Sequence, residues 1–209
     1  MDVGDEAYAW MCRFHLGDET VGGTGVLEVR RGPGVFGRLA CAVLGFPRTC
    51  TAVPARVTVH RSPGADPETG EARITERWER EIGARRLVSV QSRAGERGWE
   101  RHGPLEIRTR TVAGPDEVNV VQVGAVLRVG GREIPLPERF APRVFAHAWV
   151  EDGDRDRRPP RFHVAVRVTV PLIGVLMSYR GHIREERPVR RRTEDGRRRR
   201  GVREPREAR

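Results

Sequence analysis

Apolar and polar residues alternate with a period of two over most of this 209-residue chain, and this feature constrains its fold most strongly. Such alternation is typical of strands with one buried face, because successive side chains of a strand point to opposite sides of a sheet. One clear example comprises Val53, Ala55, Val57 and Val59, whose neighbours are mostly polar or small. The pattern predicts a mainly β protein.

Roughly eight or nine such segments follow one another between residues 24 and 183, at spacings of about 10 to 15 residues. The connections are too short for helical crossovers, which favours antiparallel pairing of neighbours. We expect a meander that curls into a closed or half-open barrel, because closure removes exposed sheet edges. A sandwich of two sheets is the alternative that this pattern leaves open.

Two segments near the N-terminus have a helical period instead. In the first, residues 6–16, the shared face holds Tyr8, Met11, Cys12 and His15. The second, residues 35–44, carries an apolar stripe and is ended by Gly45 and Pro47. A third exception is the proline-rich stretch 134–142, which we expect to be a loop outside the sheet because proline cannot donate to a strand ladder.

The C-terminal segment 184–209 differs in composition from the rest. It holds twelve Arg against six acidic residues, a net charge of +6 out of +10 for the whole chain. With almost no apolar residues it cannot offset its chain entropy, so we expect one β-rich domain over residues 1–183 and a disordered tail over 184–209. All 39 basic residues of the chain are Arg, and no aromatic residue interleaves those of the tail, so no specific nucleic-acid partner is expected.

Cysteine use and hydropathy indicate a cytoplasmic protein. The three cysteines, Cys12, Cys41 and Cys50, are an odd number without metal-ligand spacing, which fits a reducing compartment. No run approaches the ~18 apolar residues of a membrane span, and the acidic N-terminus lacks the apolar core of a signal peptide. We therefore expect no membrane span.

The sequence predicts no metal site and no bound cofactor. Its six histidines are scattered without metal-ligand spacing, and no nucleophile motif surrounds Cys50. The glycines at 22, 23 and 25 resemble a nucleotide-binding turn, but that turn needs a following helix and a third glycine where this chain has Glu28. We expect these glycines to form a turn that opens a strand.

Polar residues of equal parity on neighbouring strands would point into the lumen of a barrel. Trp78 and Arg80 share one strand face, as do Glu100 and His102, and Tyr179 lies on a later strand. These five residues are the candidate pocket, because a concave interior with a few convergent polar groups is typical of a small-molecule site. The alternative for Arg80 and Glu100 is an ion pair on the outer surface.

The chain resembles a bacterial family known as domain of unknown function 4166 over about residues 10–183. The landmarks that carry the resemblance occur in order: Phe14-His15, Gly25, residues 30–34, Leu44-Gly45-Phe46-Pro47, Trp78, Arg80, Gly83, Glu100, Gly103-Pro104, Leu136-Pro137, Pro142, Pro171-Leu172-Ile173-Gly174, Tyr179 and Gly181. Members of the family tend to have an aromatic residue where this chain has Ile82. Some similar members are attached to a dinucleotide-binding dehydrogenase module, which implies a separately encoded dehydrogenase as a possible partner here.

Three functions are compatible with these observations. The first is a binding module whose lumen accepts a small apolar ligand, oriented by residues such as Arg80 and Glu100. The second is an isomerase or cyclase that needs no cofactor, with Glu100 or His102 as general base and Tyr179 as acid. The third is an accessory partner of a dehydrogenase, which would show an exposed apolar patch and no deep pocket.

Overall fold

The computed structural model describes residues 4–43, 46–65, 70–102, 104–152, 159–171 and 173–186. It contains two helices, α1 (Gly4–Leu16) and α2 (Val35–Val43), and eleven strands. The strands are β1 (Val21–Arg31), β2 (Cys50–Ala65), β3 (Ala72–Ile82), β4 (Arg85–Ala94), β5 (Arg97–His102), β6 (Leu105–Ala113), β7 (Glu117–Val129), β8 (Arg132–Pro135), β9 (Arg143–Trp149), β10 (Arg161–Val170) and β11 (Gly174–Glu185).

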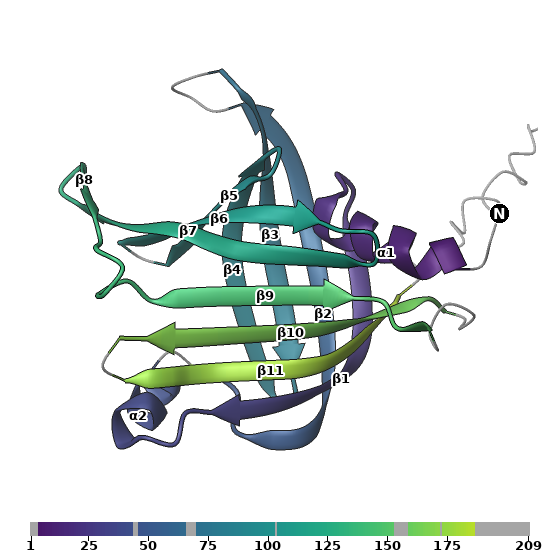
Figure 1. Cartoon of the computed structure of the whole chain (residues 1–209), viewed down its shortest axis with the longest axis horizontal. Coiled ribbons are helices and arrows are strands. Elements are labelled where there is room, and N and C mark those ends of the chain that lie inside the picture. Colours follow the sequence, from purple (N-terminus) through teal and green to yellow (C-terminus); the bar gives the residue numbers. More distant parts are fainter. Residues whose placement is uncertain are drawn as a thin grey trace, which may run out of the picture.

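Ten of these strands close into one antiparallel barrel (Figure 1). Strands β1 to β7 pair in chain order, β7 then pairs with β9, and β9, β10 and β11 continue the order until β11 pairs with β1. The short strand β8 forms a hairpin on β7 outside the barrel. The expected antiparallel meander and its closure are confirmed, and the sandwich is not formed.

The proline-rich stretch does not lie wholly outside the sheet, as we expected from its sequence. Its first residues belong to β8, in which Pro135 lies opposite Val126 of β7. Strand β8 is at an edge with no further strand beyond it, so the missing donor of Pro135 breaks no ladder. The rest of the stretch is the expected loop, with a turn in which the amide of Phe140 donates to the carbonyl of Pro137.

The glycines at positions 22, 23 and 25 lie within strand β1 and not in a turn before it, so that expectation was wrong. They belong to the seam of the barrel, which we define as the pairing of β1 with β11. A Cβ atom on Gly25 would lie 1.8 Å from the carbonyl oxygen of His182, and one on Gly181 would lie 2.1 Å from that of Val26. The two strands therefore approach each other at a curve that only glycine permits.

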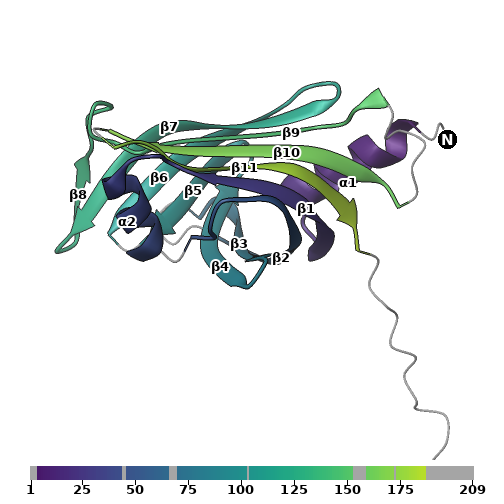
Figure 2. The same cartoon turned by 90° about the horizontal axis from the view of Figure 1, so that it is seen from below.

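Helix α1 packs against one end of the barrel, as the two views in Figures 1 and 2 show. Its buried face consists of Ala7, Trp10, Met11 and Phe14. This face is rotated by about one residue from the predicted stripe, whose other members Tyr8, Cys12 and His15 are half-buried at its margin. The rings of Trp10 and Phe14 lie 6.2 Å and 5.2 Å from that of Phe162 on β10, so aromatic packing holds the helix to the barrel.

Helix α2 lies at the opposite end, against β1 and β11. Its Cys41 is buried and its thiol donates to the carbonyl of Leu176, 3.2 Å away. Neither α1 nor α2 is long and apolar enough to cross a bilayer, and these are the helices of the part that the structure describes. Strand β11 continues to Glu185, so the first residues of the segment 184–209, which was predicted as a disordered tail, belong to the strand. Residues 187–209 lie outside the described residues.

Candidate ligand-binding cavity

The barrel encloses a cavity of about 840 Å³. Most of its wall is apolar and comes from inward-facing residues of many strands, among them Val57, Ile107, Val120, Ala146, Val166 and Met177. Several of these side chains are half-buried although they face inward, because the cavity leaves their tips without packing neighbours. A volume of this size falls in the range of ~300 to 1,000 Å³ that is typical of small-molecule sites.

The cavity is closed at one end and open at the other. Phe14 of α1 lines the first end and is buried. At the other end the lining includes Arg86, which is exposed at the start of β4, and Leu87 and Val170, which are only half-buried. A ligand would therefore enter at the α2 end of the barrel.

A bulge in β7 places more of that strand in the cavity wall than its sequence pattern predicts. The alternation assigns Val120 and Leu127 to opposite faces, yet both line the cavity. The register between β6 and β7 shifts where Arg108 lies opposite Gly124 and the next residue lies opposite Gln122. The extra residue, Val123, changes the face on which the following residues lie.

Polar groups in the wall gather around Arg80 of β3. One Nη of Arg80 donates to the Ser89 hydroxyl of β4 at 2.9 Å, and the guanidinium lies 4.9 Å from the centre of the Trp78 ring. Tyr179 of β11 faces the same group: burial raises its pKa, Arg80 lowers it through charge and hydrogen bonding, and Glu100 raises it. We call Trp78, Arg80, Ser89 and Tyr179 the Arg80 patch.

Of the five residues predicted as a pocket, the structure brings four together. The side chains of Trp78, Arg80, Glu100 and Tyr179 all line the cavity, and none of them points to the outer surface as an ion pair would. His102 ends strand β5, but its side chain lies outside the part that the structure describes. Among described residues, no carboxylate lies within 4.0 Å of the Arg80 guanidinium, whose neighbours in the Arg80 patch are uncharged.

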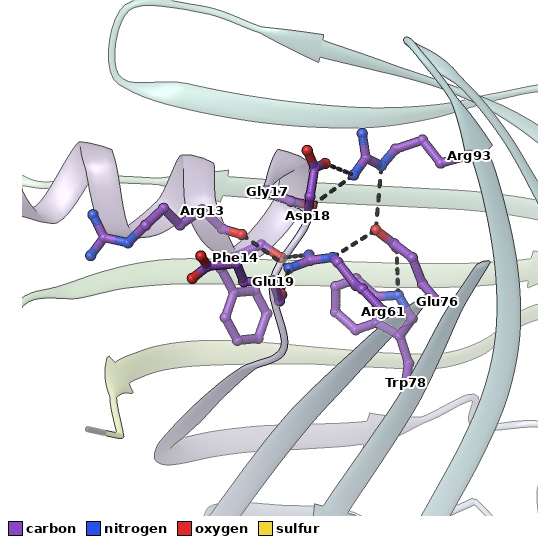
Figure 3. Close-up of polar contacts among 9 residues, drawn as sticks. All are labelled: Arg13, Phe14, Gly17, Asp18, Glu19, Arg61, Glu76, Trp78 and Arg93. Atoms are coloured by element: carbon purple, nitrogen blue, oxygen red, sulfur yellow. Dashed lines mark hydrogen bonds and ion pairs between the residues drawn. The ribbon is translucent and has the colours of Figure 1, made fainter. Parts of the chain in front are cut away.

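A buried ion pair at the closed end was missed by the sequence reasoning (Figure 3). The Nε atom of Arg61 on β2 lies 2.9 Å from a carboxylate oxygen of Glu76 on β3, and both side chains are buried. The remaining Arg61 donors reach the backbone carbonyls of Arg13, Phe14 and Glu19. Since helix carbonyls of the last turn have no partner within the helix, Arg61 acts as the C-terminal cap of α1.

The other oxygen of Glu76 accepts from the Trp78 indole at 2.9 Å, and Arg93 of β4 donates to the first oxygen at 3.3 Å (Figure 3). Arg93 also donates to the carbonyl of Gly17, just after α1. One carboxylate thus joins two arginines, a wall residue of the cavity and the helix that closes it. We expect this network to make the closed end rigid.

His15 is a second group that the sequence reasoning did not assign to the cavity, although it lies in the wall near the closed end. Its Nε2 atom is buried and has no hydrogen-bond partner. Burial, and after it the positive charges of Arg61 and Arg80, lower the pKa of this imidazole to about 3. His15 is therefore neutral at pH 7, with a polar atom free to bind a ligand. In the sequence, the position of His15 on the predicted helical face of residues 6–16 was the signal that it could face the interior.

Of two histidines on neighbouring later strands, His147 of β9 borders the cavity, whereas His163 of β10 does not line it. His147 and His163 stack on either side of Trp149, with ring centres 4.7 Å and 5.4 Å away. His147 also lies 3.0 Å from Glu117, and His163 lies 3.5 Å from Glu151. Across the described ranges, no group of three or more His, Cys, Asp or Glu residues is arranged to hold a metal ion.

Comparison with known proteins identifies the family. Residues 10–183 match the model of a family described as a domain of unknown function, DUF4166. No curated protein matches the chain. A solved structure of a protein of unknown function from the DUF3598 family of Nostoc punctiforme is 9% identical, with a TM-score of 0.44 over 82% of this chain. The match spans only 49% of that protein. Because the family model matches most of the length of this chain, the chain belongs to the DUF4166 family.

Proposed function

We propose that this protein binds a small molecule with an apolar body inside its barrel. The observation that carries the proposal is the cavity of about 840 Å³, whose wall is mainly apolar, with valine, leucine and isoleucine as its commonest apolar residues. An apolar ligand that enters the cavity is transferred from water to an apolar wall, and this removal of apolar surface from water is the main driving force for such binding. A cavity of this volume without a ligand leaves many wall atoms without contacts, so a ligand also restores packing.

We further propose that the ligand carries one carboxylate, which binds at the Arg80 patch. Arg80 and Arg93 of the wall, and Arg61 behind it, face two wall carboxylates, Glu76 and Glu100. The remaining arginine of the wall, Arg86, is paired with Glu79. Glu76 is shared by Arg61 and Arg93, whereas Arg80 contacts uncharged groups. A ligand carboxylate would balance this excess, and it fits the planar fork of a guanidinium. A dianion such as phosphate would meet more repulsion from Glu100, whose charge already reaches Tyr179.

The same wall chemistry favours binding over proton transfer. A general base works best when its pKa lies near the ambient pH. His15 has a pKa of about 3, too low for a base at neutral pH, and the raised pKa of Tyr179 makes it a weak acid. For His15 and Tyr179, ligand binding is therefore a better account than proton transfer.

Titration with cis-parinaric acid, a fluorescent long-chain fatty acid, tests both parts of the proposal. The methyl ester of the same acid has the same apolar body without the charge. We expect both probes to saturate one site, with the acid binding more tightly. Arg80→Met should weaken the acid about tenfold, the effect of losing one charge-assisted hydrogen bond, and leave the ester nearly unchanged.

Arg77→Met is the matched control, because Arg77 is exposed on β3, does not line the cavity and also pairs with Glu79. This variant should bind both probes as the wild type does. If the ester binds and the acid gains nothing over it, the carboxylate assignment is wrong while the apolar site stands. If neither probe binds the folded wild type, the proposed function is wrong.

A further inference from the structure

Exposed apolar side chains gather at the open end of the barrel. Five protrude from the segments that join strands there: Val35 (68% exposed), Leu39 (61%), Val129 (54%), Ile134 (49%) and Phe140 (57%). The first two lie one turn apart on α2, on the face away from buried Cys41. The others lie around the β8 hairpin. Figures 1 and 2 show α2 and β8 at the same end, opposite α1.

This placement is unusual for connecting segments. Single exposed apolar residues are normal on any protein, but large ones gathered around the mouth of a cavity indicate an interaction surface. Other exposed apolar residues, such as Val121 and Val123 of β7 and Phe145 opposite Val121 on β9, lie on the outer wall of the barrel and not at its mouth. They provide an internal comparison for the five at the mouth.

The charges at the two ends of the barrel differ in sign. Among described residues, the segments joining strands at the open end carry Arg38, Arg48, Arg132 and Arg139, against Glu133 and Glu138. Glu133 is paired with Arg108 and Arg128 of the barrel wall, and Arg139 lies over the ring of exposed Phe140. The connecting segments at the closed end carry mainly acidic residues, including Asp18, Glu19, Glu96, Asp116 and Glu151.

We propose that the open end docks on an anionic phospholipid bilayer. The five apolar side chains would enter the boundary between headgroups and acyl chains, while the arginines around them contact anionic headgroups. The acidic closed end would point away from the membrane. Leu136 and Pro142, from the same segment as Phe140, line the cavity, so the cavity reaches this surface and an apolar ligand could pass between bilayer and cavity with little exposure to water. This transfer of a ligand between bilayer and cavity rests on the proposed function, whereas docking on the bilayer does not.

Cosedimentation of the full chain with vesicles tests the docking, without any added ligand. Vesicles of phosphatidylcholine mixed with phosphatidylglycerol are compared with vesicles of phosphatidylcholine alone. We expect the wild type to bind the anionic vesicles more strongly. Val35→Asp combined with Leu39→Asp should reduce this binding by about tenfold, because it places two charges at the apolar boundary. Phe140→Asp, on a separate segment, should reduce it in the same direction.

The control combines Val121→Asp with Val123→Asp, which adds the same charge on the barrel wall. Residues 187–209 are identical in every variant, so attraction through their arginines is common to all. If the variants at the open end lose vesicle binding while the control binds nearly as the wild type does, the result supports docking by the open end. Equal binding by all folded variants overturns the proposal, and so does a wild type that does not bind anionic vesicles. A wild type that does not bind anionic vesicles would assign the apolar surface to a protein partner. The outcome of the vesicle experiment does not affect the parinaric acid titration, which tests the cavity separately.

Discussion

Arg61 and Glu76 form a fully desolvated ion pair between neighbouring strands, with Nε and Oε1 2.9 Å apart and side chains 0% and 4% exposed. Such a pair contributes to stability only if its remaining donors and acceptors are satisfied. Here three backbone carbonyls of the α1 region and the Trp78 indole supply those partners. The pair therefore couples closure of the barrel end to the wall of the cavity.

Replacing Arg61 with Met should cost about 3 to 5 kcal/mol of the free energy of unfolding, as breaking a buried pair from one side does. The loss leaves helix carbonyls uncapped and removes one of the two arginines that hold Glu76. Urea unfolding followed by circular dichroism measures the change. Arg30→Met is the control, since Arg30 pairs with Glu28 at the surface and should lose at most about 1 kcal/mol. Equal stability of the two variants would contradict the role given to Arg61.

The seam between β1 and β11 should not tolerate a side chain at position 25. Gly25→Ala places a methyl group against the His182 carbonyl and should destabilise the fold by about 2 to 3 kcal/mol through overpacking. Gly124→Ala is matched to it, because a Cβ there meets no atom within 4 Å. That variant should stay close to the wild type in thermal unfolding. Similar melting temperatures for both alanine variants would mean that the seam is not as tight as described.

His15 should make the protein less stable in acid. Its pKa is about 3 in the folded state against 6.5 for an ordinary histidine, so the unfolded chain binds a proton between these values that the folded chain does not. Stability from this group is therefore full above pH 6.5 and falls as the pH drops toward 3. Between pH 7 and pH 4.5 the wild type should lose on the order of 1 to 3 kcal/mol more than His15→Phe.

Urea titrations at the two pH values measure this difference. His60→Phe is the control, because His60 is exposed on β2 and its replacement should leave the pH dependence unchanged. A wild type and a His15→Phe variant with the same pH dependence would show that the Nε2 atom of His15 is not shielded from water as the structure places it.

Much of the architecture follows from local pattern alone. The alternating residues Val53, Ala55, Val57 and Val59 lie in β2, because a two-residue period marks a half-buried strand wherever it persists. The same parity predicted the shared face of Trp78 and Arg80, which lies inside the barrel. Local alternation thus predicted which side of a strand faces inward.

Features that depend on contacts between distant segments could not be predicted this way. Arg61 reads as one more polar residue of a strand, and only the position of α1 at that end of the barrel explains its burial. The bulge at Val123 and the close approach at Gly25 arise from the curvature of the closed sheet, which local alternation does not encode.

The central claim, that the barrel binds its ligand inside the cavity, is tested most directly by filling that cavity. Ala146→Phe projects a ring from β9 into the space, whereas Ala113→Phe adds the same ring at the exposed end of β6. Both variants are titrated with the methyl ester of cis-parinaric acid after circular dichroism has shown that they are folded. We predict that Ala146→Phe binds the ester at least about tenfold more weakly than Ala113→Phe, which should match the wild type. Equal affinity of the two variants for the ester would contradict binding inside the barrel.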